Sequence, residues 1–146
     1  MPSHMQIRQQ QFLSLTLELT SYMKKMSMGS FDDIKIVPKG WGFEKWIVNT
    51  ELYCGKLLHF NMGKRCSWHY HKIKDETFYV QSGELLLMYG EDDDINKGKI
   101  MVMRPGDTFH VYPGLRHQMQ ARIDTELFEF STQHFDSDSY RIEVGD

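Results

Sequence analysis

The chain has 146 residues, of which 40% are hydrophobic, 13% aromatic and 25% charged, so the composition excludes a disordered protein and predicts one domain with a sizeable core. The 17 Lys and Arg against 20 Asp and Glu give a formal net charge of −3, which argues against nucleic acid as the main partner. No apolar run approaches the roughly 18 residues of a membrane span, so we expect no membrane association.

Residues 1–30 differ in pattern from the rest, and we expect them to form an N-terminal arm and linker. Residues 2–5, Pro-Ser-His-Met, look like the remnant of an expression vector. Leucines alternate with polar residues over 13–19, which is the period of a strand, although a helical stripe also fits this stretch. The Thr content favours the strand. We expect the arm to pack against the main domain or against a partner subunit.

Residues 31–146 have an almost entirely β pattern, and we expect them to form one all-β domain. Short runs rich in β-branched and aromatic residues alternate with Gly, Pro and Asn turn signals. We expect strands at 45–48, 52–60, 66–71, 77–81, 85–89, 100–103, 108–112, 117–122, 126–131 and 140–144. Many short strands joined by tight turns are typical of a β-sandwich or barrel.

Cys54 and Cys66 are the only cysteines, fewer than a secreted domain stapled by disulfides usually carries. The N-terminus also lacks the basic region, apolar run and small-residue cleavage site of a signal peptide. We therefore expect a cytoplasmic protein.

Histidines and one glutamate recur in a pattern that suits a metal ion. His69 and His71 lie one residue apart on a predicted strand, so their imidazoles point to the same face and can converge on one ion. Glu76 follows a polar break at 72–75 that can turn the chain, and His117 follows a later Pro-Gly turn. Three neutral imidazoles and a carboxylate suit one divalent transition metal (Zn, Fe, Mn, Co or Ni) rather than calcium. A lone His-x-His is more often a packing coincidence, so the hypothesis depends on all four residues.

The residues around these four resemble the two motifs of the cupin family. The first motif is matched in type and spacing by Gly63, His69, His71, Glu76 and Gly83. The second is matched by Gly106, Asp107, Pro113, Gly114 and His117. The resemblance implies an all-β jelly-roll barrel, the double-stranded β-helix of the family, with the metal held inside by the four candidate ligands. The interior would be lined by Phe78, Val80, Phe109, Val111 and Met119, with His110 facing outward.

A second, looser resemblance is to sugar-phosphate cupins of the mannose-6-phosphate isomerase type. It rests on the Trp-Gly pair at 41–42, on Gly-Lys at 55–56, on Glu-Phe-Ser-Thr at 129–132 and on a charged tail containing Arg. It implies a metal-dependent isomerase or epimerase acting on a sugar or sugar phosphate, in which the metal stabilises an enediolate. Glu129 is then the candidate base that removes a proton beside the carbonyl, and Lys56 and His134 are candidate substrate-binding residues. The implied partner is a small molecule, a carbohydrate.

Each of these three residues also has an ordinary structural explanation. Glu129 can be a solvated charge, Lys56 a surface side chain that covers apolar groups with its stem, and His134 an isolated surface histidine. Two other functions also remain open: an Fe(II)-dependent dioxygenase, because other cupins use the same ligand set for oxygen chemistry, and a non-catalytic module that binds a sugar or metabolite. We also expect a homodimer, because the arm would otherwise leave an edge strand exposed.

Overall fold

The computed structural model of the protein describes residues 10, 12–18 and 34–146. In the arm, residues 10 and 12–18 are helical, so the strand predicted there is wrong, and the remainder of the arm and linker lies outside the described residues. Leu, Gln and Glu favour a helix, and the Thr16 hydroxyl donates a hydrogen bond to the Phe12 carbonyl one turn earlier. Among the described residues, no helix is long and apolar enough to span a membrane. Ile34–Asp146 form a compact unit of their own.

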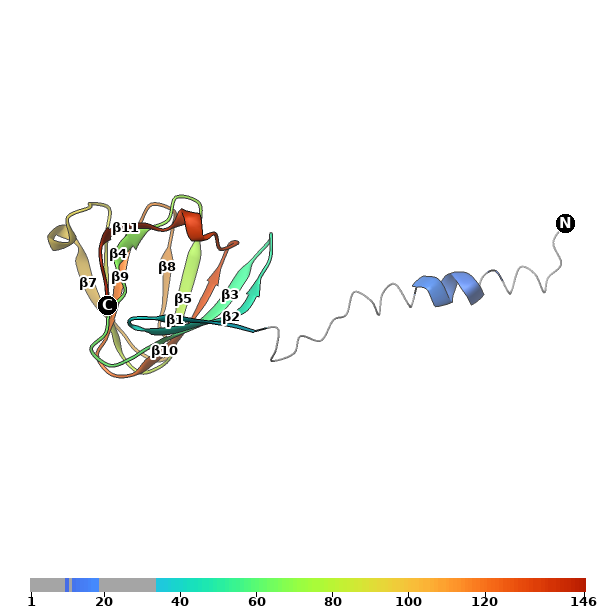
Figure 1. Ribbon diagram of the computed structural model, residues 1–146, viewed down its shortest axis with the longest axis horizontal. Helices are drawn as coiled ribbons and strands as arrows, with labels where there is room; N and C mark the ends of the chain where they lie inside the picture. Colours follow the sequence, from blue (N-terminus) through green and yellow to red (C-terminus); the bar gives the residue numbers. More distant parts are fainter. Residues whose placement is uncertain (1–9, 11, 19–33) are drawn as a thin grey trace. The chain divides into compact units, whose positions relative to one another are not determined.

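Ile34–Asp146 are built from two antiparallel sheets (Figure 1). The strands are β1 (Lys35–Lys39), β2 (Gly42–Asn49), β3 (Cys54–Phe60), β4 (Trp68–Tyr70), β5 (Glu76–Ser82), β6 (Leu85–Gly90), β7 (Lys99–Met103), β8 (Thr108–Val111), β9 (Arg116–Ala121), β10 (Thr125–Ser131) and β11 (Tyr140–Glu143). One sheet has the order β1-β2-β3-β10-β5-β8 and the other β11-β4-β9-β6-β7. From β3 onward the chain passes repeatedly from one sheet to the other, which is the jelly-roll arrangement. The all-β jelly-roll prediction is confirmed.

Each predicted strand overlaps an observed one, with differences at the ends. The run predicted at 66–71 is extended only over Trp68–Tyr70. The pattern missed β1, which contains Pro38. Proline lacks the N–H that a central strand needs, but β1 is an edge strand that pairs only with β2, and an edge strand tolerates it. Gly83, in the turn between β5 and β6, has φ 89°, and an added Cβ would collide with the backbone of Asp124 and Thr125 at the turn into β10.

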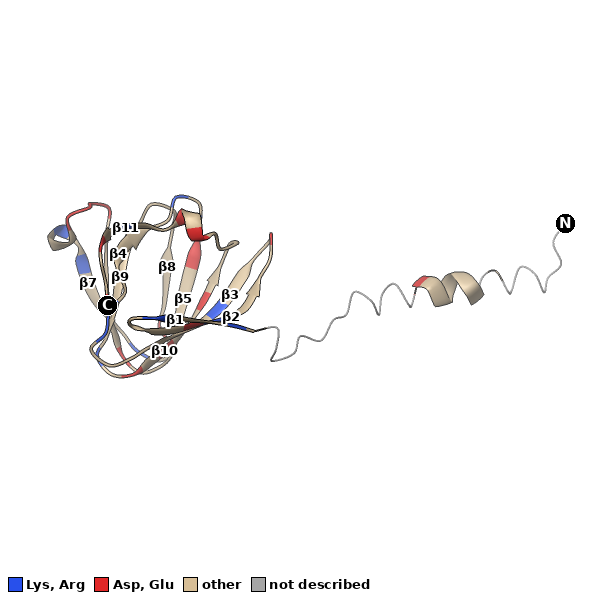
Figure 2. Cartoon of the chain, viewed as in Figure 1, with Lys and Arg blue, Asp and Glu red and all other residues tan. Residues whose placement is uncertain are grey.

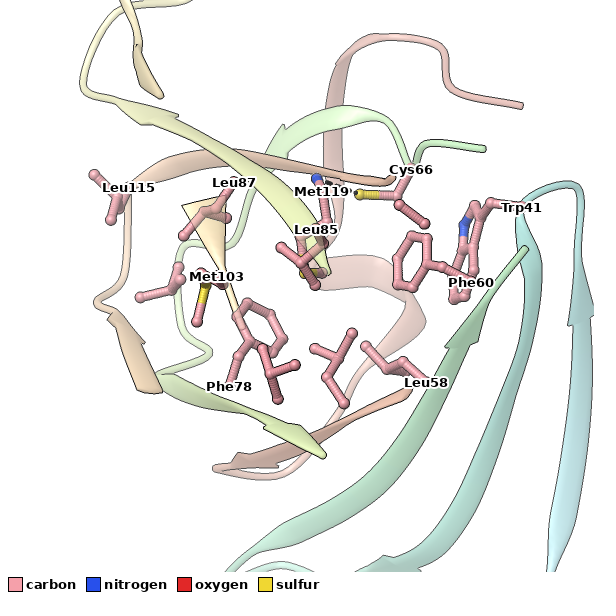
Figure 3. Packing of buried hydrophobic residues seen from close by; sticks show 14 residues of the cluster. Trp41, Leu58, Phe60, Cys66, Phe78, Leu85, Leu87, Met103, Leu115 and Met119 are labelled. Atoms are coloured by element: carbon pink, nitrogen blue, oxygen red, sulfur yellow. Dashed lines mark hydrogen bonds between the residues drawn. The ribbon is translucent and has the colours of Figure 1, made fainter. Parts of the chain in front are cut away.

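The hydrophobic core lies between the two sheets (Figure 3). Its largest members include Trp41, Phe60, Phe78, Leu87 and Met103. Of the residues predicted to line the interior, four are buried and Phe109 is partly buried, while the His110 side chain is 57% exposed, as expected. Alternate residues of β3 are buried, as the period of a strand requires, and this places Lys56 inside together with its apolar neighbours.

Candidate metal centre

The structure brings three of the four predicted metal ligands together where β4 meets β9. These strands pair at His69 and His117, which lie directly opposite each other and so point to the same face. The centroids of these two rings are 4.3 Å apart, and the ring of His71 lies 5.1 Å from that of His69. Each histidine offers a nitrogen, and the three nitrogens lie within 4.8 Å of one another. This geometry can hold one metal ion.

Each imidazole is fixed through its Nδ1 atom. In each case a backbone carbonyl lies at hydrogen-bond distance from Nδ1: Ser67 O for His69 (2.8 Å), Asp138 O for His71 (2.5 Å) and Leu115 O for His117 (3.1 Å). A carbonyl only accepts, so Nδ1 carries the hydrogen and Nε2 keeps its lone pair. Burial lowers the pKa of His69 well below its usual value and also lowers that of His71. The rings of His69 and His71 are therefore neutral, and all three histidines present Nε2 as a candidate metal ligand.

Glu76 supplies the observation that tests whether a metal fits. Its side chain is buried, and Oε1 lies 3.2 Å from Nε2 of His117 and 3.5 Å from Nε2 of His71, with no hydrogen bond. Both nitrogens carry lone pairs that face the negatively charged Oε1, and a cation bound among the three atoms would relieve this repulsion. The orphaned oxygen and the converging nitrogens fit a divalent ion held by the four predicted residues. Such a donor set suits Zn, Fe, Mn, Co or Ni.

Lys74 is a site residue that the sequence interpretation missed. It lies in the polar break at 72–75, yet it is only 4% exposed. Its ammonium lies 2.6 Å from Oε2 of Glu76 and also contacts Oε1 of Glu129. Burial alone would lower the pKa of Lys74, but these two carboxylates raise it above its usual value, so it stays charged. Burial likewise favours protonation of Glu76, but the Lys74 ammonium holds the pKa of that carboxyl well below its usual range.

Asp138 holds this arrangement in place, and it too was missed. It is the last residue of a short 3₁₀ helix, Asp136–Asp138. Its carboxylate accepts hydrogen bonds from the backbone N–H groups of Lys72, Ile73 and Lys74, at 2.9, 3.1 and 2.9 Å. Burial alone would raise the pKa of Asp138, but these donors lower it. Since its carbonyl also fixes His71, one residue orients a candidate ligand and positions the loop that carries Lys74.

Glu129 faces the inside of the barrel, so the alternative of a solvated surface charge is wrong. It lies on β10 opposite Lys56 of β3 and Phe78 of β5, and it is buried. Its Oε1 lies 3.7 Å from the Lys56 ammonium, contacts Lys74 and accepts a hydrogen bond from the Ser131 hydroxyl. Within the part of the chain that the structure describes, every partner of Glu129 contacts this one oxygen, which leaves Oε2 available to a ligand.

Lys56 is also buried, at 1% exposure, so the surface explanation is wrong for it as well. Its ammonium lies 3.6 Å from Glu44, 4.4 Å from the centre of the Trp46 ring and 3.0 Å from Nδ1 of His134. His134 therefore accepts at Nδ1 and donates from Nε2 to Asp136. Figure 2 shows a basic position on β3 and an acidic position on β5, strands that both pair with β10.

These side chains surround one cavity of about 530 Å³. Its lining includes the three histidines of the centre, together with Glu76, Lys74, Glu129, Lys56, His134, Glu44, Trp41 and Arg141. The candidate base and the candidate substrate-binding residues therefore lie in the same cavity as the candidate metal ligands. Polar and charged side chains outnumber apolar ones in this lining, so the cavity suits a polar small molecule.

Fold and site together define a small jelly-roll protein with a histidine-based candidate metal centre inside its barrel. The family model described as "Cupin domain" matches residues 56–130, about half of the chain. The chain belongs to the cupin family. No curated protein is matched by the sequence.

Solved structures share the fold at low sequence identity. The capsular polysaccharide assembling protein CapF from Staphylococcus aureus has a TM-score of 0.66 and 18% identity, with 76% of this chain and 34% of that chain covered. Oxalate decarboxylase from Bacillus subtilis has a TM-score of 0.67 and 18% identity, with 77% of this chain and 31% of that chain covered. The chain thus spans about a third of the length of these relatives.

Proposed function

We propose that the protein holds one divalent transition metal through His69, His71, Glu76 and His117 and acts as an isomerase or epimerase on a sugar or sugar phosphate. The observation that carries the proposal is the buried carboxylate of Glu129, which shares the cavity with the metal ligands and has one oxygen unengaged. A purely structural metal site has no need of such a group.

The chemistry follows from what the chain's own residues can do. Moving a proton between neighbouring carbons of an open-chain sugar needs a base at the carbon and positive charge at the carbonyl oxygen. A bound divalent ion supplies that positive charge. Glu129 takes the proton from carbon at Oε2 and returns it to the neighbouring carbon, and the sugar's hydroxyl proton passes to the former carbonyl oxygen. Lys74 and Ser131 hold the other oxygen of Glu129 still. Lys56, which lies beside Glu129, and His134, to which it is linked, bind the substrate.

One structural relative supports the choice of substrate class. CapF, which shares the fold, is described as a capsular polysaccharide assembling protein, and this description supports a carbohydrate as the substrate class. Oxalate decarboxylase shows that the same fold also serves a small acid. Because identity is 18% and only a third of each relative is covered, their activities are not transferred to this chain.

The test is proton exchange at carbon. Chelator-treated protein is reloaded with Mn, Fe, Zn or Co and incubated in D₂O with a panel of hexoses, pentoses and their phosphates. NMR should show deuterium incorporation beside the carbonyl and the formation of an isomer or epimer. Glu129→Gln should slow exchange by about 10²–10⁴-fold, whereas Glu126→Gln should not, because Glu126 lies on the outer face of β10 against His59. Absence of exchange with every metal would refute the proposal.

The same protein preparations distinguish two other functions. The ligand set of three imidazoles and one carboxylate also suits Fe(II), and oxygen consumption that depends on Fe(II) and a small substrate would favour a dioxygenase. Ligand-dependent thermal stabilisation without exchange or oxygen uptake would indicate a binding module.

We further propose that the protein is a cytoplasmic homodimer. Both cysteines are free, which agrees with a reducing compartment. On the outer face of the six-stranded sheet, Phe128 lies between Leu57 and Tyr79, and Phe130 beside it is 56% exposed. A second copy would bury this apolar face. A monomeric mass in light scattering would overturn the dimer, and recovery in a membrane or secreted fraction would overturn the location.

A further inference from the structure

The basic residues that line the cavity differ in whether they already have an acidic partner. Three of them are paired with carboxylates: Lys39 with Glu44 at 3.3 Å, Lys56 with Glu44 and Glu129, and Lys74 with Glu76 and Glu129. Arg141 also lines the cavity, and among the described residues it has no ion pair, side-chain hydrogen bond or ring contact. The positive charge of Arg141 is therefore the one in this lining that no side chain offsets.

The position of Arg141 places it next to the metal centre. It lies on β11 directly opposite His69 of β4, and residues opposite each other in antiparallel strands have Cα atoms about 4.5–5.5 Å apart and side chains on the same face. The register of β11 shifts immediately after Arg141, a kind of irregularity that often re-aims side chains beside active sites.

Ser139 reinforces this arrangement. It lies two residues before Arg141 in extended backbone, with φ −116° and ψ 105°, so both side chains project to the same side. Ser139 also lines the cavity, and among the described residues its hydroxyl has no hydrogen-bond partner. The Arg141 guanidinium and the Ser139 hydroxyl thus line one cavity as hydrogen-bond donors, and neither has an acceptor among the described residues.

We propose that Arg141, assisted by Ser139, binds an anionic group of the substrate, a phosphate or a carboxylate, while the reacting carbons lie at the metal centre. This inference rests on the proposed function, and it narrows the substrate from any sugar to a charged one. Guanidinium pairs with both kinds of oxyanion through two parallel hydrogen bonds. Lys56 and Lys74 cannot take this role as readily, because binding an anion there would break buried ion pairs.

Binding measurements test the inference without requiring turnover. The metal-loaded full-length protein is titrated calorimetrically with an aldohexose, its 6-phosphate and its uronic acid. We expect one charged form to bind about ten- to a hundredfold more tightly than the neutral sugar, the effect of a charge-assisted hydrogen bond. Arg141→Gln should remove this preference and Arg141→Lys should restore part of it. Arg104→Gln is the matched control, because Arg104 pairs with Glu84 away from the cavity. The phosphate and uronate arms identify which oxyanion is preferred.

A second titration separates this inference from the enzymatic proposal. Inorganic phosphate is added to protein from which metal and chelator have been removed, so that no ion can take the anion. Binding that weakens at least tenfold in Arg141→Gln supports the site even if no sugar is ever converted. Equal affinity of wild-type protein and Arg141→Gln for every charged probe, including phosphate, would overturn the inference even if isomerase activity is found.

Discussion

Replacing Lys74 by Met tests the electrostatics of the candidate site. In the wild-type protein Lys74 lies between two buried carboxylates, 2.6 Å from Glu76 and in contact with Glu129. Without it, Glu129 keeps Lys56 and Ser131, but Glu76 keeps only the imidazole nitrogens of His71 and His117, at 3.5 and 3.2 Å. Removing one partner of a buried ion pair costs about 3–5 kcal/mol, because the remaining charge is left without compensation. We expect the free energy of unfolding of metal-free Lys74→Met to fall by that amount.

The measurement is guanidinium denaturation at pH 7, with Lys72→Met as the matched control. Lys72 lies in the same loop but is exposed, with its ammonium 4.3 Å from the centre of the Tyr140 ring, so its loss should cost under about 1 kcal/mol. Bound metal should reduce the penalty for Lys74→Met, because the ion then compensates Glu76. A loss no larger than that of Lys72→Met, or a loss unaffected by metal, would refute the reasoning.

Three further predictions concern single residues. Asp138→Ala should lower the free energy of unfolding by about 2–4 kcal/mol at pH 7. The pKa of Asp138 in the folded protein lies below its unfolded value of about 3.9, so the stabilisation by this carboxylate is complete above the unfolded pKa and is lost as the pH falls through the folded pKa. The free energies of unfolding of wild type and variant should therefore converge in acid. A constant difference would count against the role of the carboxylate. His117→Ala should reduce bound metal from one ion per chain to a trace by elemental analysis, whereas the exposed His110→Ala should not. Burial raises the pKa of Cys66 to about 12, so iodoacetamide at pH 8 should label it only after unfolding, and rapid labelling of the native protein would contradict the buried position.

The fold could be predicted because its signals are local. The alternation of buried residues in β3 and the Gly and Pro turns follow from short segments of sequence, so they can be predicted without knowing which elements pack against them. The two errors occur where local signals conflict or mislead. In the arm, a strand period and a helical stripe coexist over the same leucines, and residues 12–18 are helical. In β1, Pro38 argues against a strand unless it is known that the strand lies at an edge.

The site was predictable only where a motif fixes the spacing. His69, His71 and His117 could be assigned from their positions relative to turns, and the structure brings them together. Asp138 lies 67 residues from His71 in the sequence, and nothing in the pattern of the C-terminal tail says that it anchors the loop before β5. Lys74 had a readable signal: it precedes Glu76 by two residues, so in extended backbone both would face the same side. A polar run before a buried glutamate therefore merits inspection for a buried counter-charge.

Lys74 acts on stability and on the candidate metal in opposite directions. It compensates Glu76 in the metal-free protein and thereby stabilises the fold, but an ion at the same carboxylate must share it with the ammonium. By thermodynamic linkage, a variant whose penalty shrinks when metal binds must bind that metal more tightly than wild type. Wild-type protein should therefore bind the metal more weakly than the variant, because Glu76 is shared between the ion and Lys74. For the same reason Glu76 neutralises less of the ion's charge. That remaining charge is available to polarise a substrate carbonyl, as isomerisation requires, whereas a metal site that only stabilises the fold gains nothing from it. A tighter-binding but slower Lys74→Met would therefore separate a catalytic centre from a structural one.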